Sequence, residues 1–380
     1  MIYFDNAATT LVKPPEVSRA VMQALATFGG AGRGMHQASL AAAMSVYETR
    51  EKIAKLFNAS APRRVAFTLN ATEALNIVIE GLIKPGDRVL TTAASHNSVL
   101  RPLYRKREQG ASLALVPVSS AGRMDYESLE YELAQGAKLL VLTHVSNLTG
   151  DVYDVRHVGE LCAAHNTLLV VDAAQTAGHF PLDMQELGIG IVVFTGHKGL
   201  FGPQGTGGLC VAEGIEIAPY KVGGSGTHSF DAHHPHLMPE SLEAGTINSH
   251  GLAGLSAGLD YVESRGVENL QRSLESITER FRTGASSLKG VTIYGGAEAC
   301  GNCGIVTLNL DGFDASQIAD RLDADFGICT RAGAHCAPLM HEALGTAETG
   351  ALRFSFSVFN TAEEVDFTLS VLEKITHEKA

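Results

Sequence analysis

Residues 167–198, TLLVVDAAQTAGHFPLDMQELGIGIVVFTGHK, decide the fold of this chain. They contain two short apolar runs, 167–171 and 191–195, each followed by polar residues. Runs that are apolar at nearly every position are typical of strands buried on both faces of a sheet. Asp172 follows the first run directly, and Lys198 comes three residues after the second. The stretch therefore predicts two buried strands with polar side chains at their carboxyl ends.

The same alternation continues outside this stretch. Apolar runs at 88–93 and 139–145 are separated by segments with helical spacing of hydrophobic residues. The helical segments are 72–83, 98–108, 125–135 and 155–165. Alternating strands and helices predict an α/β fold with a mostly parallel sheet flanked by helices. Ligands in such sheets bind beyond the carboxyl ends of the strands, so we expect the functional site there.

The last third of the chain has a different pattern, which begins after a glycine- and histidine-rich loop near 219–247. The expected elements are, in order, helices 252–265 and 267–288, strand 304–310, helix 315–326, strand 352–357 and helix 362–378. This order predicts a smaller α+β domain. We expect a large domain at 15–255 and a small domain made of 1–14 and 256–380.

Composition and charge exclude several classes of protein. The chain has 380 residues, of which 45% are apolar and 18% charged, so it can bury a large core. Its net charge of −12 argues against nucleic acid or an anionic membrane as the main partner. No apolar run reaches the ~20 residues of a membrane span, and the start does not resemble a secretory signal. Six cysteines are too few for a disulfide scaffold, so we expect a cytoplasmic protein.

Polar residues near the expected strand ends and helix starts each allow two interpretations. Asp172 is either the N-cap of a following helix or a carboxylate that pairs with a cationic cofactor atom. Lys198, beside His197 and between glycines, is either a solvated charge or an amine of lowered pKa that forms a Schiff base. Thr72 is either a helix N-cap or a phosphate ligand at a helix start. His96 is either an ordinary polar residue or a ring that stacks on a flat cofactor.

Two residues in the last third of the chain are also candidates for a catalytic or a binding role. Cys336 lies in TRAGAHCAP, residues 330–338, with Arg331 and His335 close in sequence. Most cysteines in such proteins are small buried residues, but basic neighbours lower the pKa of a thiol, which makes Cys336 the best nucleophile candidate. Arg353 enters an apolar strand and needs an anionic partner. A substrate carboxylate would serve, and so would an internal Asp or Glu.

Taken together, the motifs of the chain resemble one enzyme family. They are, in order, YFDNAATT at 3–10, RGMH at 33–36, ATEALN at 71–76, THVSN at 143–147, VDAAQ at 171–175, TGHK at 195–198, EAGT at 243–246, RAGAHC at 331–336, and Arg353 with FNT at 359–361. This order resembles the class V (aminotransferase-type) enzymes that depend on pyridoxal 5′-phosphate (PLP). Within that class it resembles the cysteine desulfurases and selenocysteine lyases of the Suf-type group. The resemblance covers nearly the whole chain and implies the PLP-dependent transferase type I fold.

The resemblance implies a role for each matching residue. The implied catalytic residues are Lys198, which would hold PLP as a Schiff base, Cys336 and His96, which would stack on the ring. The other implied cofactor ligands are Asp172 for the pyridine nitrogen, Gln175 and Asn147 for the phenolic edge, and Thr72, Thr195 and His197 for the phosphate. The implied substrate-binding residues are Arg353 for the carboxylate, Asn147, His36 and Arg331. Thr246 would reach the phosphate in a neighbouring subunit, which implies a homodimer.

The implied activity is the conversion of L-cysteine to L-alanine. Lys198 would take the Cα proton, and the Cys336 thiolate would attack the substrate sulfur and keep it as a persulfide for an acceptor protein. With L-selenocysteine the same residues would release selenium. Only 16 residues separate Cys336 from Arg353, which fits the group with a short catalytic loop. Ala334 stands where relatives often carry a histidine.

Two other functions stay open from the sequence. One is another class V activity, such as an aminotransferase, an epimerase or a C–S lyase, in which Cys336 is a bystander. The other is a non-catalytic sulfur carrier, against which Lys198 argues. Cys300 and Cys303 form a C-x-x-C that is either a turn or a redox or zinc pair, and the histidine-rich loop at 228–236 is either an entrance loop or a metal site. We expect the turn, the entrance loop and no metal.

Overall fold

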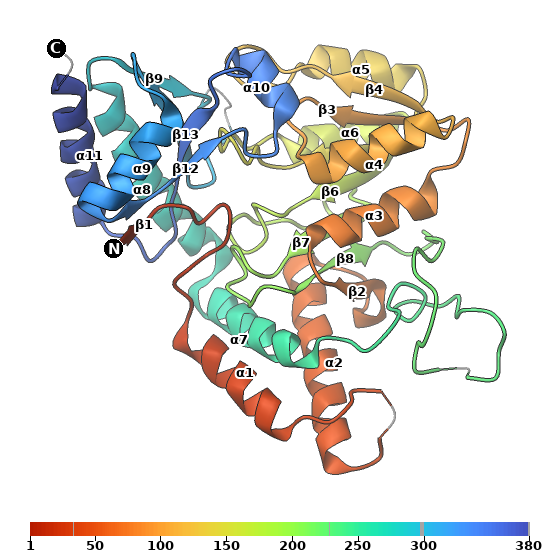
Figure 1. Cartoon of the computed structure of the whole chain (residues 1–380). Helices are drawn as coiled ribbons and strands as arrows, with labels where there is room; N and C mark the ends of the chain where they lie inside the picture. The colour runs from red at the N-terminus through yellow and green to blue at the C-terminus, as the bar shows by residue number, and fades with distance from the viewer. Residues whose placement is uncertain (33, 228, 297–299, 379–380) are drawn as a thin grey trace.

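A computed structural model describes residues 1–32, 34–227, 229–296 and 300–378 of the chain. Its largest element is a seven-stranded sheet with the order β2-β8-β7-β6-β5-β3-β4 (Figure 1). The strands are β2 (Val65–Thr68), β3 (Arg88–Thr92), β4 (Ser112–Val116), β5 (Leu139–Thr143), β6 (Leu168–Asp172), β7 (Ile191–Thr195) and β8 (Gly207–Val211). Neighbours from β7 to β4 pair in parallel, and β8 runs antiparallel to β7 and β2. The prediction of an α/β fold with a mostly parallel sheet is confirmed.

Helices cover both faces of this sheet. The central strand β5 is buried along its whole length, and its side chains alternate between two hydrophobic clusters. Leu140 and Leu142 pack with α2, α5, α6 and α7, whereas Leu139 and Val141 pack with α3 and α4. A further helix, α1, packs beside α7. The bounds of these helices are α1 (Pro15–Thr27), α2 (Gln37–Phe57), α3 (Ala71–Leu82), α4 (Asn97–Glu108), α5 (Tyr126–Ala134), α6 (Val155–Ala164) and α7 (Ser249–Arg265).

A second hydrophobic core lies beside the large sheet, at the left of Figure 1. It is built by a four-stranded sheet of order β12-β13-β10-β9, by three helices and by the start of the chain. Its elements are β1 (Ile2–Tyr3), α8 (Val267–Ser286), β9 (Val291–Tyr294), β10 (Ile305–Leu310), α9 (Ala315–Phe326), β11 (Ile328–Cys329), β12 (Arg331–Gly333), β13 (Ala351–Ser355) and α11 (Ala362–His377). β1 pairs in parallel with β11 and brings Phe4 into this core. Two short helices complete the fold: η1 (Pro62–Arg64) before β2 and α10 (Pro338–Leu344) before β13.

The expected elements compare closely with the observed ones. The strand expected at 191–195 agrees at both ends, and the run at 139–145 ends two residues early, at Thr143. The division into domains remains a prediction, and α7 runs unbroken through its boundary at 255/256. No helix in the described ranges is long and apolar enough to cross a membrane.

Candidate active site

The carboxyl edge of the large sheet holds a pocket of ≈ 530 Å³. Strands β5, β6 and β7 end there, and α3 and α4 begin there, so five elements deliver side chains to one place. The predicted site residues that line this pocket are Thr72, His96, Asn147, Asp172, Gln175, Thr195, His197 and Lys198. The topology therefore gathers residues that lie up to 126 positions apart in the sequence.

Asp172 and Lys198 influence each other's charge inside the pocket. Asp172 ends β6, and its Oδ1 accepts a hydrogen bond from the Ala174 N–H at 3.0 Å. Turns and no helix follow it, which excludes the helix N-cap interpretation. Burial raises the pKa of Asp172, and the nearby Lys198 ammonium opposes that shift. Burial also lowers the pKa of Lys198 to about 8, although Asp172 favours its charged form. About one amine in ten is therefore neutral and nucleophilic at pH 7.

The first turn of α3 forms one wall of the pocket. Asn70 is the N-cap, because its Oδ1 accepts from the Glu73 N–H at 2.9 Å. This excludes the N-cap interpretation of Thr72, whose hydroxyl shares a 2.7 Å hydrogen bond with Ser98. Thr195 also lines the pocket, and its buried Oγ1 has no hydrogen-bond partner among the described residues. A helix start with free N–H groups and an unpartnered buried hydroxyl suits an anionic group such as a phosphate.

His96 contributes a neutral ring to the pocket. It is the N-cap of α4, and its Nδ1 accepts a hydrogen bond from the Ser98 N–H at 3.0 Å. Burial and then the charge of Lys198 lower the pKa of His96 to about 4. Because Nδ1 is an acceptor, the proton of the neutral ring lies on Nε2. The sequence reasoning missed Ser98, which bonds both Thr72 and His96; its place at a helix start was the only signal.

Arg353 comes from the second core and contacts Asn147, which lines the pocket. It lies on β13 with its side chain buried, and its Nη2 donates to Asp5 Oδ1 at 2.8 Å. Its Nη1 donates to the Asn147 carbonyl oxygen at 2.8 Å, and its Nε has no partner in the described structure. Of the two partners that the sequence allowed, an internal acid is thus present. Asn147 has a buried Oδ1 that is also without a partner among the described residues, so a polar ligand has two groups to bind at this end.

The loop that carries Cys336 is held in an unusual backbone conformation. His335 and Cys336 have φ values of 50° and 56°, the left-handed region that favours glycine. Two hydrogen bonds secure the loop: Asn147 Nδ2 donates to the His335 carbonyl at 2.7 Å, and the Asn97 N–H donates to the Cys336 carbonyl at 2.8 Å. Strained backbone at two successive residues is typical of functional sites.

Cys336 differs from the buried cysteines of the chain. Its side chain is exposed, whereas burial raises the pKa of Cys162 to about 12 and also raises that of Cys210 and Cys303. The expectation that His335 supplies positive charge is wrong. Burial lowers the pKa of His335 to about 3, so the ring is neutral. It shares a 3.1 Å hydrogen bond with the Arg331 carbonyl oxygen and stacks on the ring of His341.

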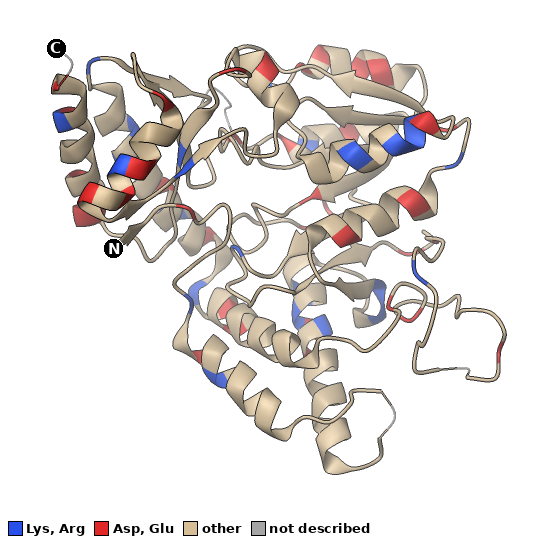
Figure 2. Cartoon of the chain, viewed as in Figure 1, with Lys and Arg blue, Asp and Glu red and all other residues tan. Residues whose placement is uncertain are grey.

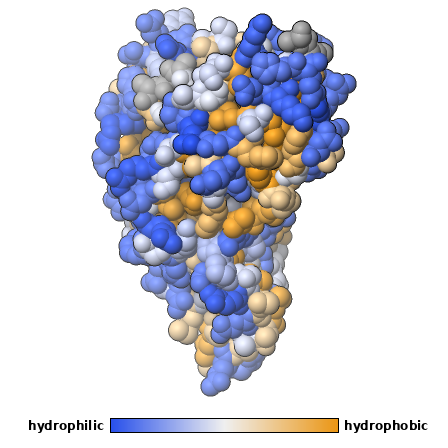
Figure 3. All heavy atoms as spheres, turned by 90° about the vertical axis from the view of Figure 1, so that its left-hand side faces the viewer, coloured by the Kyte–Doolittle hydropathy of each residue, from blue (hydrophilic) through white to orange (hydrophobic). Residues whose placement is uncertain are grey.

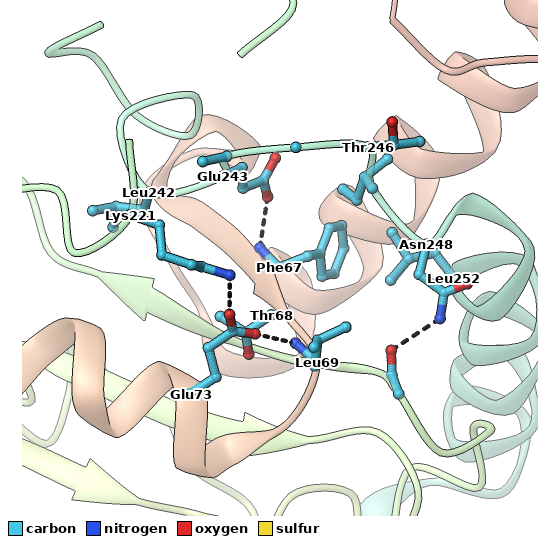
Figure 4. A pocket seen from close by; sticks show the side chains of 14 residues that line it. Phe67, Thr68, Leu69, Glu73, Lys221, Leu242, Glu243, Thr246, Asn248 and Leu252 are labelled. Atoms are coloured by element: carbon cyan, nitrogen blue, oxygen red, sulfur yellow. Dashed lines mark hydrogen bonds and ion pairs between the residues drawn. The ribbon is translucent and has the colours of Figure 1, made fainter. Parts of the chain in front are cut away.

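Besides Arg353 and Cys336, three more predicted residues do not line this pocket. Arg331 is exposed on β12 and lies opposite Arg353 in the strand pairing. His36 is the exposed N-cap of α2, and that end of α2 lies at the lower tip of the molecule (Figure 1). Thr246 is exposed beside a second pocket of ≈ 510 Å³ (Figure 4). There Glu243 accepts from the Phe67 N–H at 2.6 Å, so the pocket wall before Thr246 is fixed to β2.

Comparisons with known proteins place the chain in a family. The sequence profile of the aminotransferase class-V family matches residues 2–367. The chain belongs to this family. It is 35% identical to a probable cysteine desulfurase of Methanothermobacter thermautotrophicus over 98% of this chain and 94% of that protein. It is 33% identical to the cysteine desulfurase CsdA of Escherichia coli over 98% and 93%. The apo structure of a cysteine desulfurase from Thermococcus onnurineus superposes with a TM-score of 0.93 at 34% identity, over 99% and 95%.

The pocket of this class-V enzyme fits a planar, phosphorylated, cationic ring. Asp172 offers a desolvated carboxylate, and Lys198 offers an amine of lowered pKa. The neutral ring of His96 offers a flat face, while the free hydroxyl of Thr195 faces the same pocket as the start of α3. The described part of the histidine-rich loop and the C-x-x-C pair, which the sequence also singled out, do not line this pocket. His228 lies outside the described residues, and neither Cys300 nor Cys303 forms a disulfide in the described structure.

Proposed function

We propose that this protein is a PLP-dependent cysteine desulfurase that converts L-cysteine to L-alanine and takes the sulfur onto Cys336. One observation carries the proposal: an exposed thiol is held, in strained backbone, in a groove that shares Thr72, His96 and Ser98 with the pocket that contains Lys198. The names of the relatives support it. A transaminase or epimerase has no need of a thiol in that place.

The pocket residues would hold PLP in defined ways. Lys198 would bind it covalently, Asp172 would stabilise its ring nitrogen as a cation, and His96 would lie against the ring. The phosphate would lie at the start of α3, with Thr72 and Thr195. When bound, PLP withdraws electrons from the substrate Cα and weakens the bonds to Cα and Cβ.

Two residues would handle the substrate itself. Arg353 would bind the carboxylate of L-cysteine, using its free Nε and moving partly away from Asp5. Lys198, once released, would take the Cα proton, because its lowered pKa makes the amine a usable base near neutral pH.

Cys336 would act as the nucleophile. Its thiolate attacks the sulfur of the bound substrate, a sulfur–sulfur bond forms and the Cβ–S bond breaks. The electron pair of that bond stays with carbon, and Cβ gains a proton to become the methyl group of alanine. Thiol and cysteine thus become persulfide and alanine, with no outside oxidant or reductant.

We also propose that two copies of the chain form a homodimer. Exposed apolar side chains on α1 and α2 support this; they are Met22, Leu25, Leu40, Met44 and Tyr47. On α2 they recur every three or four residues and form one stripe. Hydrophobic atoms reach the surface at the lower, narrow end of the molecule, where these helices lie (Figure 3). In such a dimer Thr246, exposed beside its own pocket, would reach the phosphate of the partner subunit.

The test uses the PLP-loaded protein with L-cysteine and a reductant, beside two variants. Cys336→Ala removes the proposed nucleophile, and Cys300→Ala removes the other exposed thiol as a matched control. We expect equal amounts of alanine and sulfide from the wild type and from Cys300→Ala. We expect a loss of about a hundredfold or more in Cys336→Ala.

Other outcomes would contradict parts of the proposal. Unchanged turnover in Cys336→Ala would show that the thiol is a bystander and favour a C–S lyase. Turnover of L-selenocysteine without turnover of L-cysteine would favour a selenocysteine lyase. The six cysteines form no disulfide in the described structure, which supports a reducing compartment such as the cytoplasm as the place of action.

A further inference from the structure

An open groove extends from Cys336 along the outside of α4. It has a volume of ≈ 920 Å³, and we call it the α4 groove. Its lining residues are Thr72, Asn76, His96, Asn97, Ser98, Arg101, Pro102, Arg105 and Cys336. Three of them, Thr72, His96 and Ser98, also line the active-site pocket, so the two spaces meet. Cys336 can therefore be reached from the groove without passing through the pocket.

The α4 groove is positively charged, although the protein as a whole is acidic. The chain carries a net charge of −12, yet α4 has four cations. Blue segments mark this helix in Figure 2, which has the view of Figure 1. Glu80 on α3 pairs with both Arg105 and Lys106, so one carboxylate serves two cations. Arg101 is exposed and forms no ion pair with any described residue. A local surplus of positive charge remains beside the thiol.

The desulfuration reaction does not use this charge. The single carboxylate of L-cysteine is assigned to Arg353, which is buried and bonded to the pocket residue Asn147, whereas Arg101 and Arg105 line only the groove. Arg101 and Arg105 follow Asn97, the residue bonded to Cys336, by four and eight positions. On a helix these positions lie about 6 and 12 Å along the axis. A thiol of amino-acid size cannot span that distance, whereas about four extended residues can.

We propose that the α4 groove docks an acidic segment of a sulfur-acceptor protein, with a cysteine of that segment facing Cys336 and carboxylates facing Arg101 and Arg105. The inference rests on the proposed function, because it needs a persulfide on Cys336. Docking on charges at the rim of a site raises the association rate and makes it dependent on salt.

The transfer step balances without another reactant. The acceptor thiolate attacks the outer sulfur of the Cys336 persulfide, and a new sulfur–sulfur bond forms on the acceptor. The bond between the outer sulfur and Cys336 Sγ breaks, and its electron pair leaves on Sγ. Cys336 returns as a thiolate, ready for the next substrate, and the proton of the acceptor thiol goes to solvent.

The experiment separates loading from transfer. The PLP-loaded enzyme receives one equivalent of L-cysteine, and the alanine released measures formation of the persulfide. Free amino acid is removed, and one of three thiols is added: a synthetic peptide with one cysteine followed by glutamates, the same peptide with glutamines, or glutathione. Mass spectrometry follows the sulfur gained by each thiol over time.

Two arginine variants and a matched control test the groove. Arg101→Glu and the double variant Arg101→Glu/Arg105→Glu reverse the charge of the groove. Arg107→Glu makes the same change on the same helix outside the groove, where Arg107 packs over Tyr104. The double variant also loses the ion pair between Arg105 and Glu80, which can lower its stability. In that case Arg101→Glu alone is the test, because Arg101 forms no ion pair with a described residue.

We expect alanine release to be equal in all variants. Transfer to the glutamate peptide should be about tenfold faster than to the glutamine peptide at low salt, and this advantage should shrink as salt is added. Arg101→Glu should remove most of the advantage, and Arg107→Glu should keep it.

Four results would overturn the inference. Equal rates for the two peptides, or equal effects of Arg101→Glu and Arg107→Glu, would show that the groove does not select acidic segments. Glutathione reacting as fast as the glutamate peptide would point to a small thiol as acceptor. If no alanine is released at the start, the proposed function itself is contradicted, and the docking inference fails with it.

Discussion

At the scale of single residues, Asp172 and Lys198 each oppose the pKa shift that burial causes in the other. Asp172 and Lys198 were predictable as site residues, because parallel strands end at one edge of a sheet. The partner of Arg353 was not, because Asp5 lies 348 positions away and meets it only through β1 and β13. The burial of His335 could not be predicted from the sequence either, because it depends on packing against His341.

The pKa of Lys198 predicts how the PLP-free protein takes up PLP. Only the neutral amine reacts, and burial lowers its pKa to about 8. The rate of covalent PLP binding should therefore rise about tenfold per pH unit below pH 8 and level off above it. Stopped-flow absorbance measures this rate. A rate that still climbs between pH 9 and 10 would indicate an ordinary lysine and contradict the account.

Asp172 is expected to serve cofactor binding at a cost in stability. Its buried carboxylate has a raised pKa, so its ionised form destabilises the folded protein above that pKa. Asp172→Asn should leave the Tm of the PLP-free protein unchanged or raised, and should weaken PLP binding at least about tenfold. Asp260→Asn, which changes an exposed carboxylate that pairs with the half-buried Lys52, is the control. A lower Tm with unchanged PLP affinity would assign Asp172 a structural role.

At the scale of elements, the sequence predicted the buried parallel strands better than the rest of the sheet. Runs such as 191–195 are apolar at nearly every position, and this one is bounded by Gly190 and Gly196. β8 begins with two glycines and pairs antiparallel to β7, so neither propensity nor alternation indicated it. β1 and β12 have two and three residues, and only their distant partners define them.

Close packing of α7 positions the loop after Lys198. A Cβ on Gly258 would lie 2.2 Å from the Leu200 carbonyl oxygen, which is backbone and cannot turn aside. Gly258→Ala should destabilise the protein by about 1–3 kcal/mol despite its better helix propensity. In the control Gly284→Ala, the nearest atom, at 2.3 Å, is the flexible end of Leu369, so a smaller change is expected.

Urea unfolding of the two variants measures this difference. The loss of activity in Gly258→Ala should exceed its loss of folded fraction, because Leu200 lies two residues from Lys198. Equal unfolding midpoints for Gly258→Ala and Gly284→Ala would show that α7 can move away from the loop without cost.

At the scale of the whole molecule, charge and hydrophobicity lie on different regions. The cations of α4 gather near Cys336, and the exposed apolar side chains of α1 and α2 gather at the lower end. Neither region could be predicted from composition, because composition gives only the net charge of −12 and not its distribution. The predicted homodimer came from the resemblance alone.

The apolar stripe on α2 predicts the oligomeric state. Leu40→Glu/Met44→Glu should convert a wild-type dimer into monomers, because charged residues would be buried at the interface. Phe367→Glu, at an exposed apolar position on α11, is the control and should remain dimeric. Sedimentation velocity distinguishes the states. PLP affinity should fall with the dimer if Thr246 completes the partner's site, and a double variant that stays dimeric would move the interface elsewhere.

The central claim is that Cys336 receives the sulfur of L-cysteine. The most direct measurement is mass spectrometry of peptides from the PLP-loaded enzyme, alkylated immediately after one equivalent of L-cysteine is added. The account predicts one added sulfur on the peptide that contains Cys336, in proportion to the alanine formed, and none on the peptides of the other five cysteines. Alanine formed with no sulfur on Cys336, or sulfur on another cysteine, would contradict it.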